Sequence, residues 1–188
     1  MTTLLEHMFE NMKHVQLHRR GRAMSKLAKQ LSDESGFLQV KSLTQVILPL
    51  CSSYLMNQTY VKNSDMVEQA IELLSSICHT LPWQQYESNC KFYIDLFAKE
   101  AQAHQNQLVK ITTAVLDAFH FDISENEEDT EKEKIQKERI CNTFNNVLLP
   151  MLHRTLSGKQ KGPSQLSLSD EDKLIQRVPL SIPIIKIL

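Results

Sequence analysis

The chain has 188 residues, with 21 basic and 22 acidic side chains and a formal net charge of −1. Hydrophobic residues make up 41% of it, which is enough for a buried core and too much for a disordered chain. Only 4 glycines and 6 prolines are present, too few for the turns of an all-β fold or the phosphate loops of a Rossmann-type enzyme. The near-neutral charge excludes a protein that is basic throughout, but it leaves a local basic patch open.

Neither end of the chain looks like a targeting or membrane segment. The first ten residues include Glu6 and Glu10 and lack the basic and apolar regions of a signal peptide. The apolar run from Val178 to Leu188 contains Lys186 and is too short to span a bilayer. We therefore expect an intracellular protein without a membrane partner. Because the chain stops inside this apolar run, we also expect it to be a fragment or a short isoform.

Apolar residues recur at helical spacing over most of the chain. A first predicted helix has one apolar face, made of Leu4, Leu5, Met8, Phe9, Met12 and Val15. A second begins at Leu17, with a bend expected at Gly21. A third runs from Leu38 to Leu55 and is interrupted at Pro49, which removes a backbone donor and kinks a helix.

Further helices follow. The stretch Asn63-Ser64-Asp65 supplies an N-cap for a helix that extends to Leu81, and Glu68 is spaced to complete a capping box from Asp65. Pro82 then stands where a new helix begins, and we expect Trp83, Tyr86 and Tyr93 of that helix to be buried. A further helix is predicted over 105–119.

Two polar stretches interrupt this pattern, one at residues 122–131 and one at residues 157–169. Residues 122–131 hold six acidic side chains and no basic one, which indicates an extended, solvated loop. The predicted organisation is therefore helical repeats at 1–120, an acidic disordered loop at 121–133, a helical repeat segment at 134–156, a flexible linker at 157–169 and the start of a further, truncated repeat at 170–188.

One internal repeat is visible. Val46-Ile-Leu-Pro-Leu50 matches Val147-Leu-Leu-Pro-Met151, and the two prolines are 101 residues apart. The sequence thus predicts an all-α fold, a HEAT/armadillo-like α-solenoid of stacked helical hairpins. A single irregular helical domain is the alternative.

No group of residues indicates catalysis or metal binding. The four cysteines lie in apolar stretches without CxxC spacing, as buried thiols do: Cys51, Cys78, Cys90 and Cys141. His14 and His18 have the spacing of two metal ligands on a helix but lack the glutamate of HExxH, so two exposed helix histidines is the preferred interpretation. Asp117 and His120 have no nucleophile nearby. We expect a protein that is not an enzyme and has no cofactor, metal or small-molecule substrate.

The charge pattern is more informative. Six basic residues and no acidic one lie between Asn11 and Ser32. The candidate contacts to RNA phosphates are Arg19, Arg20, Arg22, Lys26 and Lys29. His18 shares a helix face with three of them. The competing interpretation, a solvated face or ion pairs to a neighbouring repeat, remains open.

Four segments resemble one known family. They are Leu81-Pro-Trp-Gln-Gln-Tyr86, Leu116-Asp-Ala-Phe-His-Phe-Asp122, Glu138-Arg-Ile-Cys-Asn-Thr-Phe-Asn-Asn-Val-Leu-Leu-Pro150 and Arg177-Val-Pro-Leu-Ser-Ile-Pro-Ile-Ile-Lys186. In this order they resemble the giant HEAT-repeat component of the small-subunit processome, also called the down-regulated-in-metastasis family. That family's proteins are far longer than this chain.

The resemblance implies a non-enzymatic scaffold in the nucleus and nucleolus that supports ribosomal RNA processing. Its partner would be a pre-ribosomal ribonucleoprotein, through its proteins and pre-rRNA. The alternative is a helical-repeat adaptor that binds a peptide or protein partner in its concave groove, since solenoids serve both purposes.

Overall fold

The computed structural model describes residues 4–33, 38–99, 105–124 and 129–156. All regular secondary structure within these ranges is helical, which confirms the predicted all-α, helical-repeat class. The chain divides into two compact units, Met1–Pro82 and Trp83–Leu188. The predicted linker at 157–169 and the predicted repeat start at 170–188 lie outside the described residues.

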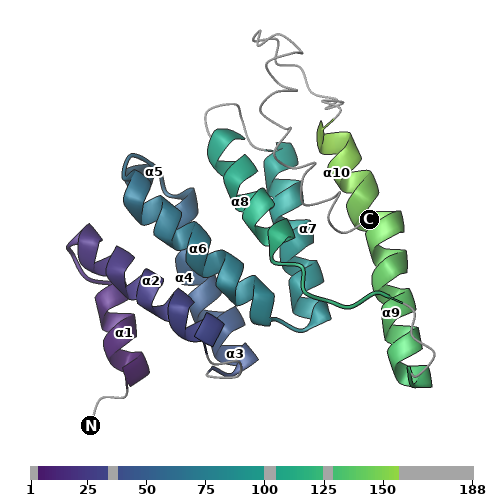
Figure 1. Cartoon of the computed structure of the whole chain (residues 1–188). Coiled ribbons are helices and arrows are strands. Elements are labelled where there is room, and N and C mark those ends of the chain that lie inside the picture. The colour runs from purple at the N-terminus through teal and green to yellow at the C-terminus, as the bar shows by residue number, and fades with distance from the viewer. Residues whose placement is uncertain (1–3, 34–37, 100–104, 125–128, 157–188) are drawn as a thin grey trace, which may run out of the picture. The chain divides into compact units, whose positions relative to one another are not determined.

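In the first unit, the other helices are arranged around the last one, α6 (Ser64–Thr80). In chain order its helices are α1 (Leu4–Met12), α2 (Leu17–Asp33), α3 (Val40–Ser42), the π-helical turn η1 (Leu43–Ile47), α4 (Leu48–Met56), α5 (Gln58–Val61) and α6 (Ser64–Thr80). Helix α6 packs against α2 and α4, and α1 packs against α2 (Figure 1). The residues that fill this core are apolar and almost fully buried, among them Met24, Leu27, Leu43, Leu73 and Leu74.

The second unit contains α7 (Trp83–Lys99), α8 (Gln105–Asp117), α9 (Glu131–Thr143), the π-helical turn η3 (Phe144–Leu148) and α10 (Leu149–Leu156). Helix α7 packs against α8 and α10 (Figure 1). Trp83, Tyr86 and Tyr93 are buried on α7, as predicted.

Three of the four segments that carry the family resemblance meet in one aromatic cluster. The Trp83 ring lies 5.2 Å from the Phe121 ring, and Phe119 lies 6.3 Å from Phe144. Tyr86 touches Phe119 and Phe121, and its hydroxyl donates to the Val115 carbonyl at 3.0 Å. These segments therefore hold the core of the second unit together, and their aromatic residues are structural.

The predicted internal repeat has a structural counterpart. The π-helical turns η1 and η3 are 101 residues apart, the same separation as Pro49 and Pro150. In each, the residue after the turn donates its N–H five residues back, Leu48 to Leu43 and Leu149 to Phe144. A π turn widens the helix just before the proline, where the ring would otherwise clash with the preceding turn.

The buried faces of the two copies also match. Each buries four residues at the same register: Leu43, Ile47, Cys51 and Tyr54 in the first, and Phe144, Leu148, Leu152 and Thr155 in the second. The two copies are therefore the same packing unit used twice.

The connection between α1 and α2 corrects two predictions. Helix α1 ends at Met12, so Val15 does not continue its apolar face and is 87% exposed. His14 lies in the same connection, so it does not share a helix with His18. The reason is local: His14 Nδ1 accepts the Gln16 N–H at 3.0 Å, and its carbonyl accepts a hydrogen bond from Arg20 Nε, which together hold a turn.

Helix α2 runs through Gly21 as one continuous helix, and the Gln69 side chain of α6 fills the space beside it: a Cβ at this position would lie 1.7 Å from Gln69 Oε1. One prediction about a helix start was wrong. Helix α6 is capped by Asn63, whose side chain accepts the Met66 N–H at 3.1 Å, so the box from Asp65 to Glu68 does not form. A capping box does occur at α9, between Thr130 and Glu133.

Candidate nucleic-acid interface

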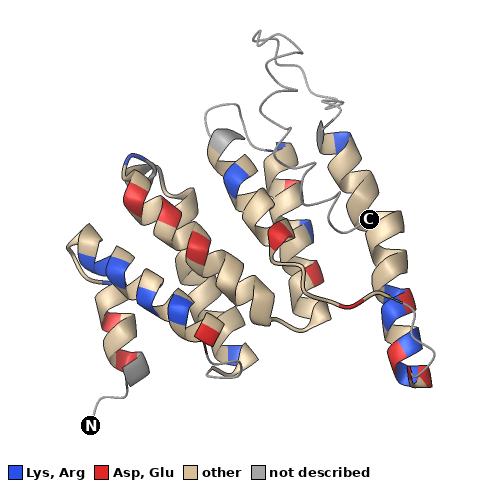
Figure 2. Ribbon diagram, in the orientation of Figure 1, with Lys and Arg blue, Asp and Glu red and all other residues tan. Residues whose placement is uncertain are grey.

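Four exposed basic residues of the first unit lie along one side of α2. The opposite side is buried and consists of small and apolar residues: Gly21, Ala23, Met24, Leu27, Ala28 and Leu31. That face is held against α6, and the residues on the far side of α2 are exposed to solvent. Arg19, Arg22, Lys26 and Lys29 are all exposed there, and we call these four the cationic row (Figure 2). At 1.5 Å per residue, the row extends about 15 Å along the helix.

The four cations of the cationic row have no acidic partner within the described part of the chain. The ion pairs found there involve other lysines, such as Lys91 with Glu87 and Lys137 with Asp129. Arg19 has one polar neighbour, since its Nη1 lies 3.3 Å from His14 Nε2. The charges of the row are therefore available to an anionic ligand.

Arg20 differs from the other candidates, although it follows Arg19 directly. It is half-buried, and its Nη1 donates to the Tyr60 hydroxyl at 2.9 Å. Its guanidinium also lies over the rings of Tyr54 and Tyr60, 5.5 and 5.3 Å from their centroids. The Tyr54 hydroxyl donates to the Met12 carbonyl at 2.5 Å, and burial raises the pKa of Tyr54 against the opposing effect of the Arg20 charge. Arg20 thus ties α2 to α4 and α5.

A groove between α1 and α2 brings three residues of the cationic row together with α1. It has a volume of about 380 Å³. The α2 side of the groove is lined by Arg19, Arg22, Ala23 and Lys26, and the α1 side by His7, Met8 and Asn11. Sequence reasoning missed His7 and Asn11. Their spacing of four residues on α1 was the available signal, but only the packing of α1 against α2 shows that they face the basic residues.

Acidic residues surround this basic surface. Glu6 and Glu10 are exposed on α1, and Asp65, Glu68 and Glu72 are exposed on α6 (Figure 2). Glu72 accepts a hydrogen bond of 3.5 Å from Ser25 of α2. The positive surface is therefore a narrow strip, which limits an anion to the cationic row and the groove beside it.

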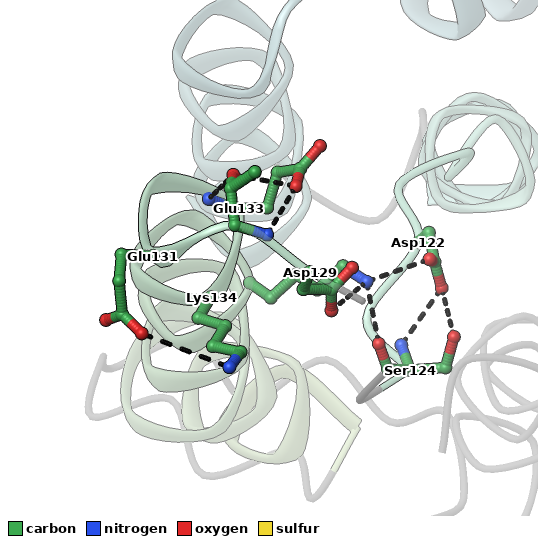
Figure 3. A network of polar contacts seen from close by, with 8 residues as sticks. Asp122, Ser124, Asp129, Glu131, Glu133 and Lys134 are labelled. Carbon is green, nitrogen blue, oxygen red and sulfur yellow. Dashed lines mark hydrogen bonds and ion pairs between the residues drawn. The ribbon is translucent and has the colours of Figure 1, made fainter. Parts of the chain in front are cut away.

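A second polar cluster lies in the second unit, where Lys137 holds part of the predicted acidic loop against α9. Its Nζ is 3.0 Å from Asp122 Oδ2 and 2.8 Å from Asp129 Oδ2, and it donates to the Ser124 carbonyl at 2.8 Å. Figure 3 shows these contacts together with the capping box formed by Thr130 and Glu133. Hydrogen bonds from Ser124 and the Lys137 charge lower the pKa of Asp122 to about 2.

This cluster changes the prediction for residues 121–133. The described parts of that range are not simply solvated, because Lys137 neutralises two of their carboxylates. Helix α9 begins at Glu131, before the predicted start at residue 134, because Thr130 caps it. Residues 125–128 lie outside the described ranges.

In the described ranges, no group of three or more histidine, cysteine, aspartate or glutamate side chains is placed so that it could hold a metal ion. Cys51, Cys78 and Cys90 are buried as predicted, whereas Cys141 is half-exposed. Burial raises the pKa of both Cys51 and Cys90 to about 12, so neither forms a thiolate near neutral pH. None of the helices that the structure describes has the length and apolar character needed to cross a bilayer.

Comparison with known proteins gives one informative similarity. No family model matches the chain. Over 111 residues, 59% of this chain, it is 29% identical to the U3 small nucleolar RNA-associated protein 20 of Schizosaccharomyces pombe. The matched part is 4% of the length of that yeast protein. The chain is therefore similar to a short segment of a much longer protein whose name links it to a small nucleolar RNA.

Proposed function

We propose that this chain is a non-enzymatic helical-repeat scaffold of a nucleolar pre-ribosomal particle, the small-subunit processome, and that it supports ribosomal RNA processing. The observation that carries the proposal is the similarity to a U3 small nucleolar RNA-associated protein. The all-helical fold supports it, because stacked helical hairpins present extended surfaces for assembly. The location that follows is the nucleus and nucleolus, and the partner is a pre-ribosomal ribonucleoprotein.

We further propose that the cationic row contacts RNA through phosphates. Arg19, Arg22, Lys26 and Lys29 are exposed and have no acidic partner in the described part of the chain. Arginine and lysine along a helix can neutralise phosphates, but they cannot easily read bases without exposed aromatic residues for stacking. The deep, narrow major groove of A-form RNA does not admit a helix, so the contacts would be to the backbone. Arg20 is left out because its guanidinium is bonded to Tyr60.

The test is the salt dependence of RNA binding by the purified chain. Binding of two unrelated single-stranded RNAs is measured by fluorescence anisotropy over a series of salt concentrations. Changing Arg19, Arg22, Lys26 and Lys29 to Gln removes four charges and keeps helix propensity. For every phosphate that the variant no longer neutralises, the log–log slope should fall by roughly 0.7, equally for both RNAs.

A matched control removes four exposed charges from the second unit, by changing Lys132, Lys134, Arg139 and Arg154 to Gln. It should leave the slope nearly unchanged. If both quadruple variants remain folded and bind with the slope of the original chain, the cationic row is a solvated face and the proposed contact is wrong. If the chain instead captures a protein partner even after nuclease treatment, and binds no RNA at all, the adaptor function is favoured.

A further inference from the structure

We infer that the groove between α1 and α2 binds one phosphate group of the RNA backbone, and that His7 of α1, held in place by Asn11, completes the site begun by Arg22 and Lys26 of α2. This inference rests on the proposed function, but it adds a second helix and one neutral donor, the Nε2–H of His7, to the contact. It thus changes the expected binding mode from a row of charges on one helix to a groove with two walls.

The α1 wall of the groove has a defined hydrogen-bonding pattern. Asn11 Nδ2 is 2.8 Å from the His7 carbonyl oxygen, which can only accept, so Nδ2 is the amide nitrogen and donates. The same Nδ2 is 2.5 Å from His7 Nδ1, which must then be the acceptor. A neutral His7 therefore carries its proton on Nε2 and offers an N–H donor. The intrahelical bonds also restrain Asn11, so this wall is ordered before a ligand binds.

The α2 wall supplies positive charge. Arg19, Arg22 and Lys26 all line the groove. A guanidinium presents its N–H groups in a fork that matches two phosphate oxygens, and a lysine adds a point charge. Between the two walls lie Met8 and Ala23, which are 4% and 8% exposed. An apolar floor lowers the local dielectric, so the attraction between these cations and an anion is stronger than on an open surface.

The lining also indicates which anion fits. Each phosphate in an RNA strand carries one negative charge, and a groove of about 380 Å³ with three cations can surround it on several sides. No phenylalanine, tyrosine or tryptophan lines the groove, so it offers none of the large aromatic faces on which bases commonly stack. Lys29 lies beyond the groove on the same exposed side of α2, where it can meet the next part of the strand. The RNA backbone is thus the occupant that both the groove and the cationic row can bind together.

The experiment compares neutral and charged changes in the full 188-residue chain. The double variant His7→Ala/Asn11→Ala removes two hydrogen-bonding side chains. It removes no formal charge when His7 is neutral. With a 20-nucleotide single-stranded RNA, we expect about a tenfold loss of affinity and an unchanged salt slope. Arg22→Gln with Lys26→Gln should reduce both affinity and slope. The matched control, Gln84→Ala with Ser88→Ala, changes an exposed polar pair of the same spacing on α7 and should have no effect.

The outcomes separate this inference from the proposed function. If the original chain does not bind RNA, the proposed function and the groove both fail. If it binds RNA and the charged variant lowers the slope, but the His7 and Asn11 variant keeps full affinity, only the groove is wrong. A polyglutamate peptide that binds the chain as tightly as RNA, and loses affinity equally in both variants, would show an acidic protein segment as the occupant and overturn the assignment. Circular dichroism melting confirms that each variant is folded.

Discussion

The guanidinium of Arg20 donates from Nη1 to the hydroxyl of Tyr60 at 2.9 Å and lies over the Tyr60 ring. These residues are 40 positions apart in the chain. This contact makes Arg20 different from its neighbour Arg19, whose side chain is exposed. Two adjacent arginines of one basic run therefore have different tasks, one in folding and one on the surface.

This contact predicts that Arg20→Gln destabilises the first unit. The change removes a hydrogen bond from a charged donor and two contacts with aromatic rings, and we expect the free energy of unfolding to fall by about 1–3 kcal/mol. Arg19→Gln, the matched control, should change it by less than about 0.5 kcal/mol. Urea denaturation followed by circular dichroism measures both. Equal effects of the two substitutions would contradict the division between them.

The repeated packing unit predicts equal roles for Ile47 and Leu148. Each is 1% exposed at the same position of its π-helical turn. Replacing either with Ala should lower the free energy of unfolding of its own unit by about 2–5 kcal/mol, because each change leaves a cavity. The neighbouring Val46 is 45% exposed, so Val46→Ala is the control and should cost little. A cost below about 1 kcal/mol for Leu148→Ala would mean that the second copy is not packed like the first.

The contacts of Asp122 predict a pH dependence in the second unit. Hydrogen bonds from Ser124 and the Lys137 charge lower the pKa of Asp122 from 3.8 to about 2. A carboxyl whose pKa is lowered on folding contributes stability above its unfolded pKa, and that contribution is lost as the pH falls through the folded value. The cluster around Lys137 should therefore be intact above about pH 4 and weaken between pH 4 and 2.

The measurement is an NMR titration of the Asp122 side-chain carboxyl. Its midpoint should be close to 2 in the original chain and rise towards 3.8 in Ser124→Ala and in Lys137→Gln. A midpoint that is the same in all three proteins would show that neither side chain holds the Asp122 carboxylate.

Periodicity alone was enough to predict most of the helices and many of their buried faces. Trp83, Tyr86 and Tyr93 were expected in the core and lie there, and the 101-residue repeat of the two prolines has its counterpart in two π-helical turns. This works because the residues of one helix face are neighbours in the sequence, three or four positions apart. Where a prediction depended on a competing local contact, it failed: Asn63 caps α6 instead of Asp65, and the turn around His14 exposes Val15.

The sequence by itself determined the helical class, the repeat and the presence of a basic stretch in this protein. Only the tertiary structure decided what each basic residue does. Arg20 donates a hydrogen bond to Tyr60, while Arg22 and Lys26 line a groove whose other wall contains His7 and Asn11. Lys137 forms ion pairs with two carboxylates of the preceding loop. Charge and spacing are local properties that can be read along a chain. The partner of a side chain, however, depends on which helices pack together, and that is set by the burial of their apolar faces.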